Sequence, residues 1–244
     1  MNFKEEFWKT KLPIGFYDNL YTSGINKNRG LQHTWHHMSF LKVLKYISTD
    51  SIHLDYACGP GTLIGNFLNC KSTGYDIAEK QIEFASKKYG EENKIFTSNK
   101  DDINIKDNFN IITVMGLIEA ISKEEFIEEL IFLLNLLNSN GKIVFTTPNY
   151  GGLMYLLEKI SNLFNQVNYR EVKTSYYTKR KIESILLEFS KIQPINFKVK
   201  KILNIGVLFS IFNKNIAIRL ENIIEKIFVN KFGFLLEVEV EKII

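Results

Sequence analysis

An acidic residue followed by two glycines is the clearest sign of chemistry in this sequence. Residues 54–62 read LDYACGPGT, in which a short apolar run ends at Asp55 and Gly59 and Gly61 follow. Glycine lacks a Cβ, so the chain can turn tightly there and its amides can approach a ligand closely. At the start of a helix such amides have no partner within the helix and favour a polar or anionic group. This glycine turn predicts a site for a nucleotide-like ligand.

Acidic residues after the next two predicted strands extend this site. Asp76 ends the predicted strand 72–76, where its carboxylate can accept hydrogen bonds from both hydroxyls of a ribose. Asp101 and Asp102 follow the third strand, where a carboxylate can accept a hydrogen bond from an adenine amine. Two other interpretations stay open. Asp76 can be the N-cap of the following helix, and the other two acids can belong to a solvated turn.

The elements that must position these residues alternate in type. Between residues 52 and 121, apolar strand-like segments alternate with helical ones, as in a doubly wound sheet with helices on both faces. The strands are predicted at 52–56, 72–76, 94–98, 109–115 and 142–147, and the helices at 62–68, 78–89 and 123–137. Gly141 is interpreted as the C-terminal cap of the last helix. Parallel strands bring their carboxyl ends to one edge of the sheet, where ligands bind.

The composition is that of a globular chain without a nucleic-acid-binding surface. Its 244 residues are 45% hydrophobic and 24% charged, which is enough to bury a core. Lysine and arginine number 31 against 27 acidic residues, for a net charge of +4, so we expect no nucleic-acid partner and at most peripheral membrane contact. Two cysteines favour reduced thiols over a disulfide framework or a zinc site. With no signal-like start and no membrane-spanning apolar run, a cytoplasmic protein is expected.

Several motifs in order resemble those of the class I S-adenosylmethionine-dependent methyltransferases. LDYACGPGT is similar to that family's first motif, GYDIAEKQIEFA to the segment with its ribose-binding acid, and FNIITVMGLIEAI and GKIVFTTPN to its fourth-strand and fifth-strand motifs. The similarity spans about residues 50–150. Two departures stand out. Tyr56 and Ala57 replace the commoner apolar-glycine pair, and Ala120 stands where many relatives have a histidine after Glu119, which leaves a general base on that loop open.

The resemblance implies S-adenosylmethionine as the cofactor and a position for each of its parts. The glycine turn would hold the methionine part, Asp76 the ribose, and Asp101 or Asp102 the adenine, which Gln81 would flank. The residues expected to bind the cofactor are Asp55, Ala57, Cys58, Gly59, Pro60, Gly61, Thr62, Asp76, Ile77, Gln81, Asp101, Asp102, Met115, Gly116 and Leu117. The resemblance also implies a seven-stranded, mostly parallel, Rossmann-like sheet whose last strand is antiparallel to its neighbours.

Two other functions stay open beside methyl transfer to a small molecule. An NAD-dependent oxidoreductase shares the sheet, the glycine turn and the ribose acid. Its fingerprint needs a third glycine where this chain has Ile64, with Gly65 one place late. The second alternative is a non-catalytic partner subunit with the methyltransferase fold. Such a subunit would not need the acids Asp55 and Asp76, so their presence favours an enzyme.

A helical preface and two apolar insertions flank the core. The chain, residues 1–244, is interpreted as one domain with the preface at 1–50 and the cofactor-binding core at 51–150. The insertions, at 148–177 and 206–231, are expected on the substrate side. Because both insertions are apolar, we expect a hydrophobic small-molecule acceptor, lipid-linked or glycan-linked molecules included.

The first insertion contains an apolar helical stripe from Leu153 to Phe164, interpreted either as a lid over the site or as a helix packed in the core. The pocket beneath it is expected to be lined by tyrosines: Tyr169, Tyr176 and Tyr177. Further along, a helix capped by Thr178 is predicted to run through residue 187, and the last two strands at 197–203 and 233–242.

No catalytic residue can be assigned from the sequence. Methyl transfer by direct in-line displacement needs no metal and no covalent intermediate, so the rate depends on holding two reactants in line in a dry pocket. A hydroxyl acceptor needs a base, for which His36, His37 and then Glu119 are weak candidates. His33 and His37 have helical i, i+4 spacing but lack the glutamate of a helical zinc site, so no metal is expected. Packing and ligand contact both stay open for these histidines.

Overall fold

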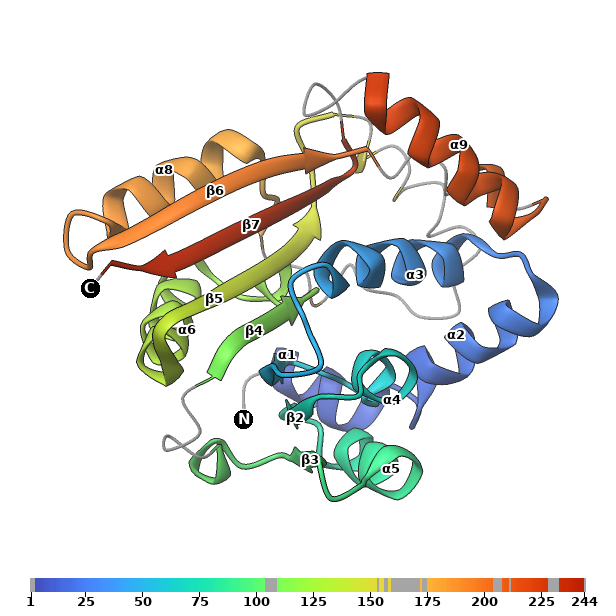
Figure 1. Cartoon of the computed structure of the whole chain (residues 1–244), viewed down its shortest axis with the longest axis horizontal. Coiled ribbons are helices and arrows are strands. Elements are labelled where there is room, and N and C mark those ends of the chain that lie inside the picture. Colours follow the sequence, from blue (N-terminus) through green and yellow to red (C-terminus); the bar gives the residue numbers. More distant parts are fainter. Residues whose placement is uncertain are drawn as a thin grey trace.

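The chain folds into one seven-stranded mixed sheet with helices packed around it, as the computed structural model shows (Figure 1). The described residues are 3–103, 109–152, 154, 155, 158, 172, 175–203, 208–210, 212–227 and 233–243. The strands are β1 (Ile52–Tyr56), β2 (Lys71–Tyr75), β3 (Lys94–Thr97), β4 (Phe109–Met115), β5 (Leu137–Pro148), β6 (Ile195–Ile202) and β7 (Leu235–Lys242). Their order across the sheet is β3-β2-β1-β4-β5-β7-β6.

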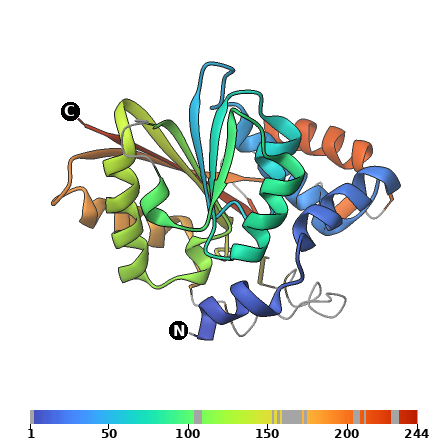
Figure 2. The ribbon, with the colours of Figure 1, turned by 90° about the horizontal axis from the view of Figure 1, so that it is seen from below.

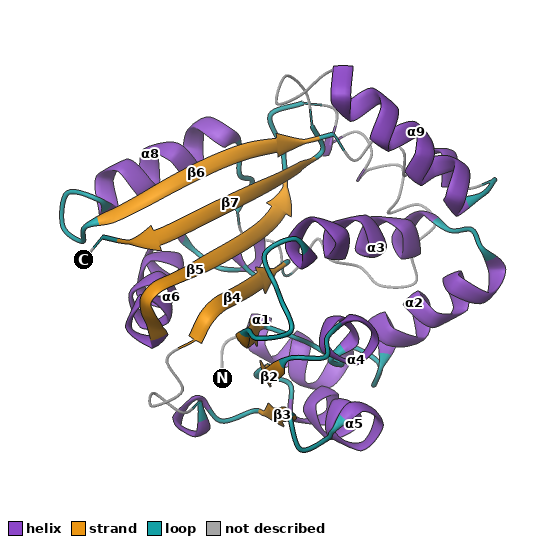
Figure 3. Ribbon diagram, in the orientation of Figure 1, coloured by secondary structure: helices purple, strands orange, loops and turns teal. Residues whose placement is uncertain are grey.

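Helices cover both faces of this sheet (Figure 3). The described ones are α1 (Phe3–Glu6), α2 (Phe16–Lys27), α3 (Leu31–Leu44), α4 (Thr62–Phe67), α5 (Glu79–Tyr89), α6 (Lys123–Leu136), α8 (Lys179–Phe189) and α9 (Lys214–Ile227), with short helical turns η1 (Phe7–Lys11), η2 (Lys100–Asp102) and η4 (Ile118–Ala120). Figure 2 shows α6 and α8 on one side of the sheet and α3 and α4 on the other. No described helix is long and apolar enough to span a bilayer.

The two faces of the central strands supply two hydrophobic cores. Successive strand side chains point to opposite faces. Ile112 and Val114 of β4 therefore lie in the core that α6 and α8 cover. Ile111 of the same strand lies in the second core, with Val43 of α3 and Ile64 of α4. Burial on both faces explains why β4 is an almost continuous apolar run in the sequence.

The strand directions confirm the predicted fold class. Strands β1 to β5 pair in parallel, and β7 is antiparallel to both β5 and β6. The bounds of β4 are the predicted ones, and most other predicted elements differ by one or a few residues at their ends. The helical preface is present as α1, η1, α2 and α3. Thr178 caps α8 as predicted, because its side chain accepts from the amide of Lys181.

The prediction that Gly141 caps a helix is wrong. Helix α6 ends at Leu136, and β5 begins at once at Leu137 and continues through Gly141. A Cβ at Gly141 would lie 2.8 Å from the carbonyl oxygen of Phe109 on β4. The register of the β4–β5 pair shifts between Phe109 and Ile111. The glycine is therefore needed where two strands approach closely at an irregularity of the ladder.

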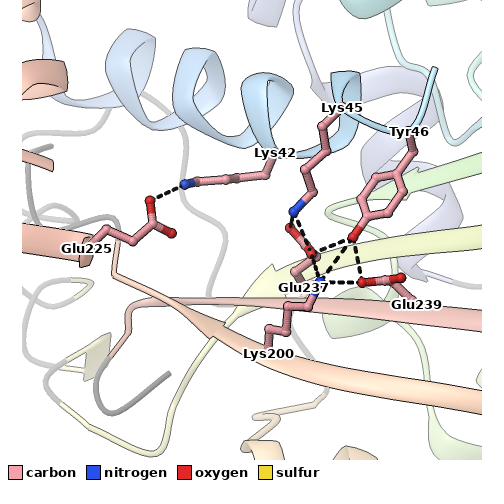
Figure 4. Close-up of polar contacts among 7 residues, drawn as sticks. All are labelled: Lys42, Lys45, Tyr46, Lys200, Glu225, Glu237 and Glu239. Carbon is pink, nitrogen blue, oxygen red and sulfur yellow. Dashed lines mark hydrogen bonds and ion pairs between the residues drawn. The ribbon is translucent and has the colours of Figure 1, made fainter. Parts of the chain in front are cut away.

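A charged cluster fixes the carboxyl end of α3 on the sheet (Figure 4). The buried carboxylate of Glu237 on β7 accepts from Lys45 at 2.7 Å and from the Tyr46 hydroxyl at 2.7 Å. Glu239, two residues further along β7, binds the same hydroxyl at 2.6 Å and pairs with Lys200 of β6. Buried carboxylates need such partners. The cluster therefore sets the position of α3, which carries part of the site, relative to β7.

Candidate functional site

A cavity of about 620 Å³ opens at the carboxyl ends of the parallel strands. Its walls come from the glycine turn after β1, from the segments after β2, β4 and β5, and from the N-terminal preface. The predicted cofactor residues that line it are Asp55, Ala57, Cys58, Gly59, Pro60, Thr62, Asp76, Ile77, Gln81, Met115, Gly116 and Leu117. The topology thus brings most of the predicted residues to one place, as expected for this type of sheet.

The glycine turn contains three residues in the left-handed region. Ala57, Gly59 and Gly61 have φ values of 66°, 53° and 72°. The value at Ala57 is uncommon for a residue with a Cβ and marks local strain. A Cβ at Gly59 would meet nothing within 4 Å, so open space lies in front of this residue, whereas a Cβ at Gly61 would lie 2.6 Å from the Phe96 ring. Gly59 therefore leaves room at the cavity, and Gly61 permits close packing behind it.

Asp55 is a buried carboxylate with one satisfied oxygen. Its Oδ1 accepts from the Thr113 hydroxyl at 2.8 Å. Its Oδ2 has no hydrogen-bond partner among the described residues. Burial raises the pKa of Asp55 to about 7. A buried carboxylate oxygen without a partner, in a residue of the cavity lining, fits a cationic donor such as the ammonium group of a bound amino acid.

Asp76 binds the glycine turn and the start of α5 together. Its Oδ2 accepts from the amide of Gly59 at 2.9 Å, and its Oδ1 accepts from the amide of Ala78 at 2.9 Å. Burial raises the pKa of Asp76, and the two amide donors oppose that shift. Each oxygen keeps further lone-pair capacity, and the residue lines the cavity. The hydrogen bond from the amide of Ala78 agrees with the interpretation of Asp76 as a helix cap. Because both oxygens can accept further hydrogen bonds, binding of ribose hydroxyls by Asp76 stays a prediction.

Gln81 lines the cavity, but its amide is engaged with the preface. Its Oε1 accepts from the amide of Gly15 at 2.9 Å, and its Nε2 donates to the carbonyl of Pro13 at 3.0 Å. On the same helix, Lys88 pairs with the buried Asp18 of α2. These contacts hold the preface against α5. Contact of Gln81 with adenine stays a prediction.

Asp101 and Asp102 lie outside the cavity lining, in the exposed turn η2. Asp102 accepts from the Thr97 hydroxyl at 2.9 Å, and the amide of Asp101 donates to the side chain of Asn99 at 3.1 Å. Their predicted contact with adenine therefore also stays a prediction. The neighbouring Lys100 does line the cavity, although no motif in the sequence predicted it there.

The preface supplies a wall of the cavity that no motif in the sequence predicted. The residues of this preface wall are Glu5, Trp8, Leu12, Tyr17, Trp35, His36, Ser39 and Phe40. Both tryptophans of the chain are among them. The ring centroids of Tyr17 and His36 lie 5.3 Å apart in an edge-to-face contact. No spacing in the sequence places α1, α2 and α3 over the strand ends, because that arrangement depends on tertiary contacts.

The three candidate bases have different surroundings. His36 lines the cavity, whereas His37 lies behind it with its Nδ1 2.8 Å from the Tyr21 hydroxyl. Burial lowers the pKa of both imidazoles to about 4, so both are neutral at pH 7. Glu119 lines the cavity and accepts from the Thr147 hydroxyl at 2.9 Å. Among the described residues, no group of histidine, cysteine and acidic side chains is arranged to hold a metal ion.

The described lining of the cavity carries more negative than positive charge. Its acidic residues are Glu5, Asp55, Asp76, Glu119, Glu125 and Glu129. The basic residue in this described lining is Lys100, which pairs with Glu129 at 2.8 Å. Low-dielectric walls strengthen the field of such charges. The cavity therefore favours cationic ligands and disfavours strongly anionic ones.

Tyr176 and Tyr177 do not line the cavity, so that prediction is wrong for both. Tyr177 is fully buried in the core, with its ring centroid 6.2 Å from that of Phe126 on α6. Tyr176 is exposed and contacts the ring of Tyr150, at a centroid distance of 4.8 Å. Tyr169 and most of the helical stripe predicted between Leu153 and Phe164 lie outside the described residues. The aromatic residues of the described cavity lining come from the preface and from the ends of β1 and β2, where Tyr56 and Tyr75 lie.

A family model described as a methyltransferase domain matches residues 31–190. This match covers more than half of the chain, so the chain belongs to this methyltransferase family. Because that family is one of methyltransferases, the match decides against the NAD-dependent oxidoreductase. A search of curated proteins found no match.

Solved structures of other proteins share the fold, and two of those named here are described as methyltransferases. The plantazolicin methyltransferase BamL, solved with a triazolic desmethylPZN analog and SAH, is 22% identical, with 98% of this chain and 94% of that chain covered and a TM-score of 0.58. The magnesium protoporphyrin IX methyltransferase ChlM from Synechocystis PCC 6803, solved with SAH, is 13% identical, with 98% of both chains covered and a TM-score of 0.57. DhpI, solved with SAM and HEP, is 10% identical, with 97% and 94% covered and a TM-score of 0.56.

Family and fold together define a class I S-adenosylmethionine-dependent methyltransferase. The cavity also fits this cofactor on its own geometry. The unpartnered oxygen of Asp55 suits an ammonium group, and the open space at Gly59 leaves room beside the turn. The negative charge of the lining suits a cationic molecule.

Proposed function

We propose that the chain transfers a methyl group from S-adenosylmethionine to a small-molecule acceptor bound in the same cavity. The observation that carries this proposal is one continuous cavity of about 620 Å³ lined both by the predicted cofactor residues and by the preface wall. Cavities of this volume suit small ligands. When bound, the cofactor supplies a methyl group activated by a positively charged sulfur.

The cofactor is assigned to the strand-end side of the cavity. Asp55 and the glycine turn bind its methionine part, with the free oxygen of Asp55 accepting from the ammonium group. Asp76 binds the ribose hydroxyls with the lone pairs that its two amide donors leave open. Residues 115–117 and Ile77 flank the cofactor, and Asp101 or Asp102 is proposed for the adenine amine.

The acceptor is assigned to the preface wall. Trp8, Tyr17 and Trp35 offer apolar aromatic surface for a molecule with a hydrophobic body. The excess of acidic residues disfavours an acceptor with strong negative charge. The solved relatives named for plantazolicin and magnesium protoporphyrin IX support an acceptor of small-molecule size. A lipid-linked or glycan-linked molecule is the more specific form of this proposal.

The chain contributes positioning and a dry environment rather than a covalent intermediate. The preface and the strand ends enclose both reactants, which excludes water and fixes their approach. If the acceptor is a hydroxyl or an amine, the neutral imidazole of His36 or the carboxylate of Glu119 accepts its proton, because both line the cavity. His37 is the weaker candidate, since it lies behind the wall against Tyr21.

The single-domain organisation over residues 1–244 and a cytoplasmic location belong to the same proposal. The shared cavity supports the first, because the preface and the core both line it. The free thiols of Cys58 and Cys70 support the second, since thiols stay reduced in the cytoplasm.

Equilibrium dialysis with labelled S-adenosylmethionine and with labelled NAD tests the proposal first. We expect saturable binding of the first molecule and none of the second. Incubation with labelled cofactor and a panel of hydrophobic alcohols, phenols and amines then tests turnover. Cofactor binding without transfer to any acceptor class would favour the non-catalytic partner subunit, and absence of cofactor binding would contradict the proposed function altogether.

A further inference from the structure

Helix α9 exposes a stripe of large apolar side chains. Ile216, Ile223 and Ile227 are 52%, 58% and 64% exposed, and Phe212, just before the helix, is 81% exposed. Residues seven and eleven positions apart lie on the same side of a helix. We call these four residues the α9 stripe. Large contiguous apolar surface on a helix marks an interaction site when it is not part of the core.

The opposite side of α9 is anchored to the rest of the molecule. Ala217 and Glu221 are buried. Glu225, on the same side, pairs with Lys42 of α3 at 2.5 Å (Figure 4). The amide of Lys214 donates to the carbonyl of Asn28 at 2.8 Å. With this side held, the α9 stripe faces outward in a fixed direction, and Figure 1 shows α9 at the periphery of the molecule.

Among the described residues of α9, the exposed charges that border the α9 stripe are positive. Arg219 and Lys226 are exposed and follow Ile216 and Ile223 by three residues, so they border the stripe on the helix surface. The acidic residues of α9 do not offset these positive charges, because Glu221 is buried and Glu225 pairs with Lys42 of α3. The exposed Lys27 and Arg29 flank Asn28, which binds the start of α9, and they add positive charge at that end.

We propose that α9 docks on a membrane surface that contains anionic lipid, with the α9 stripe inserted among the headgroups. An amphipathic helix with isoleucine and phenylalanine on one side and arginine and lysine along its border is the kind that lies in the plane of a membrane interface. Anionic headgroups complement the basic border. The α9 stripe is a convex helix surface rather than a groove, which suits a deformable lipid partner.

A second copy of the chain is a poorer occupant than lipid. A two-fold interface places the same surface on both partners. Two α9 stripes face to face would bring Arg219 and Lys226 of one copy close to those of the other, and like charges across an interface oppose association. The inference does not depend on the proposed function.

Co-sedimentation with lipid vesicles tests this inference. The full chain is mixed with vesicles of phosphatidylcholine alone and of phosphatidylcholine with phosphatidylserine. We expect binding to the second kind that weakens as salt is raised. Ile223→Asn should weaken vesicle binding by about tenfold, because a polar group replaces apolar surface that is inserted into the membrane. The double variant Arg219→Glu with Lys226→Glu should abolish the preference for phosphatidylserine.

The matched control is Ile192→Asn, because Ile192 is 82% exposed in the turn after α8 and lies outside the stripe. We expect this variant to bind vesicles like the parent chain, and all variants to keep the parent melting temperature within a few degrees and to bind S-adenosylmethionine. The inference is overturned if the parent chain binds both vesicle types equally or binds neither. It is also overturned if Ile192→Asn loses as much vesicle binding as Ile223→Asn does. Sedimentation equilibrium tests for a dimer. If the parent chain forms a dimer that Ile223→Asn loses, and the parent chain does not bind vesicles, the occupant is a second copy of the chain instead.

Discussion

At the scale of single residues, Asp55 combines burial with an unmet hydrogen-bonding requirement. Its raised pKa, about 7, means that the folded chain binds this proton more tightly than the unfolded chain does. Stability therefore falls as the pH rises from about 4 to 7, because the folded state must then hold an ionised buried carboxylate. The same ionised carboxylate is what an ammonium group needs. Under the proposed function, Asp55 lowers the stability of the ligand-free protein and contributes to ligand binding.

We predict that Asp55→Asn stabilises the ligand-free protein at pH 8 and weakens cofactor binding. The free energy of unfolding in urea should rise by about 1 kcal/mol or more at pH 8, and the difference from the parent should shrink towards pH 4. Calorimetry should show weaker binding of S-adenosylmethionine to the variant. In the parent chain, affinity should fall as the pH drops below about 7. A parent affinity independent of pH between 5 and 8 would argue against Asp55 as the ammonium partner.

Thr113 connects Asp55 to a second buried group. Its hydroxyl donates to Asp55 Oδ1 at 2.8 Å and lies 2.8 Å from Nε2 of His53, whose pKa burial lowers to about 3. Because the hydroxyl of Thr113 donates its proton to Asp55, its oxygen must accept the hydrogen bond from His53. The neutral His53 therefore carries its proton on Nε2. One hydroxyl is therefore the partner of two buried side chains, at Oδ1 of Asp55 and at Nε2 of His53.

We predict that Thr113→Val destabilises the chain by about 1–3 kcal/mol, because it leaves both groups without a partner. The loss of the donor should also move the pH midpoint of cofactor binding upward, since the hydroxyl lowers the pKa of Asp55. Urea unfolding measures the first effect, and calorimetry at several pH values the second. Thr113→Ser is the control that keeps the hydroxyl. If the serine variant shifts the midpoint as far as the valine variant does, the hydroxyl is not the cause.

At the scale of elements, the sequence predicted the parallel half of the sheet and not the preface wall. Strands such as β4 carry their own signal, because burial on both faces demands an apolar run. Because the apolar runs locate the carboxyl ends of those strands, they also indicated Asp55, Asp76 and the glycine turn as candidate site residues. Trp8 and Trp35 carry no comparable signal, since their place depends on how Gln81 and Asp18 hold the preface on α5. Tyr177 was assigned to the pocket because aromatic character alone does not distinguish core from cavity.

The junction of α6 and β5 shows a second limit of sequence patterns. A glycine after a helix is most often a cap, but here the chain passes from helix to strand without a loop. The requirement for Gly141 comes from the carbonyl oxygen of Phe109 on the neighbouring strand. A contact between strands that lie apart in the sequence cannot be read from local spacing.

We predict that Gly141→Ala destabilises the chain by about 1–3 kcal/mol, because the new Cβ would lie 2.8 Å from a backbone oxygen that cannot move freely. A helix-capping glycine would have required a positive φ, whereas here the cost is steric. Gly152→Ala is the matched control, since a Cβ there would meet nothing within 4 Å. Thermal unfolding of the two variants should separate them clearly. Equal melting temperatures would contradict the tight approach of β4 and β5.

At the scale of the whole molecule, the cavity is built from parts with different origins in the chain. The core supplies Asp55, Asp76 and the segment 115–117, and the preface closes the space with aromatic side chains. Both tryptophans lie in that wall. Intrinsic tryptophan fluorescence is therefore expected to report on the occupancy of the cavity beside the preface wall without any need for turnover.

We predict that aromatic probes of equal size bind this cavity in the order benzylamine, benzyl alcohol, benzoate. The acidic lining attracts the ammonium and repels the carboxylate, and the apolar wall holds the ring in all three cases. Titration of tryptophan fluorescence should give affinities about tenfold apart between the two charged probes, with the gap closing at high salt. Trp8→Phe and Trp35→Phe assign the signal to each ring. Benzoate binding as tightly as benzylamine would show that the charges of the lining are neutralised within the protein and do not select the acceptor.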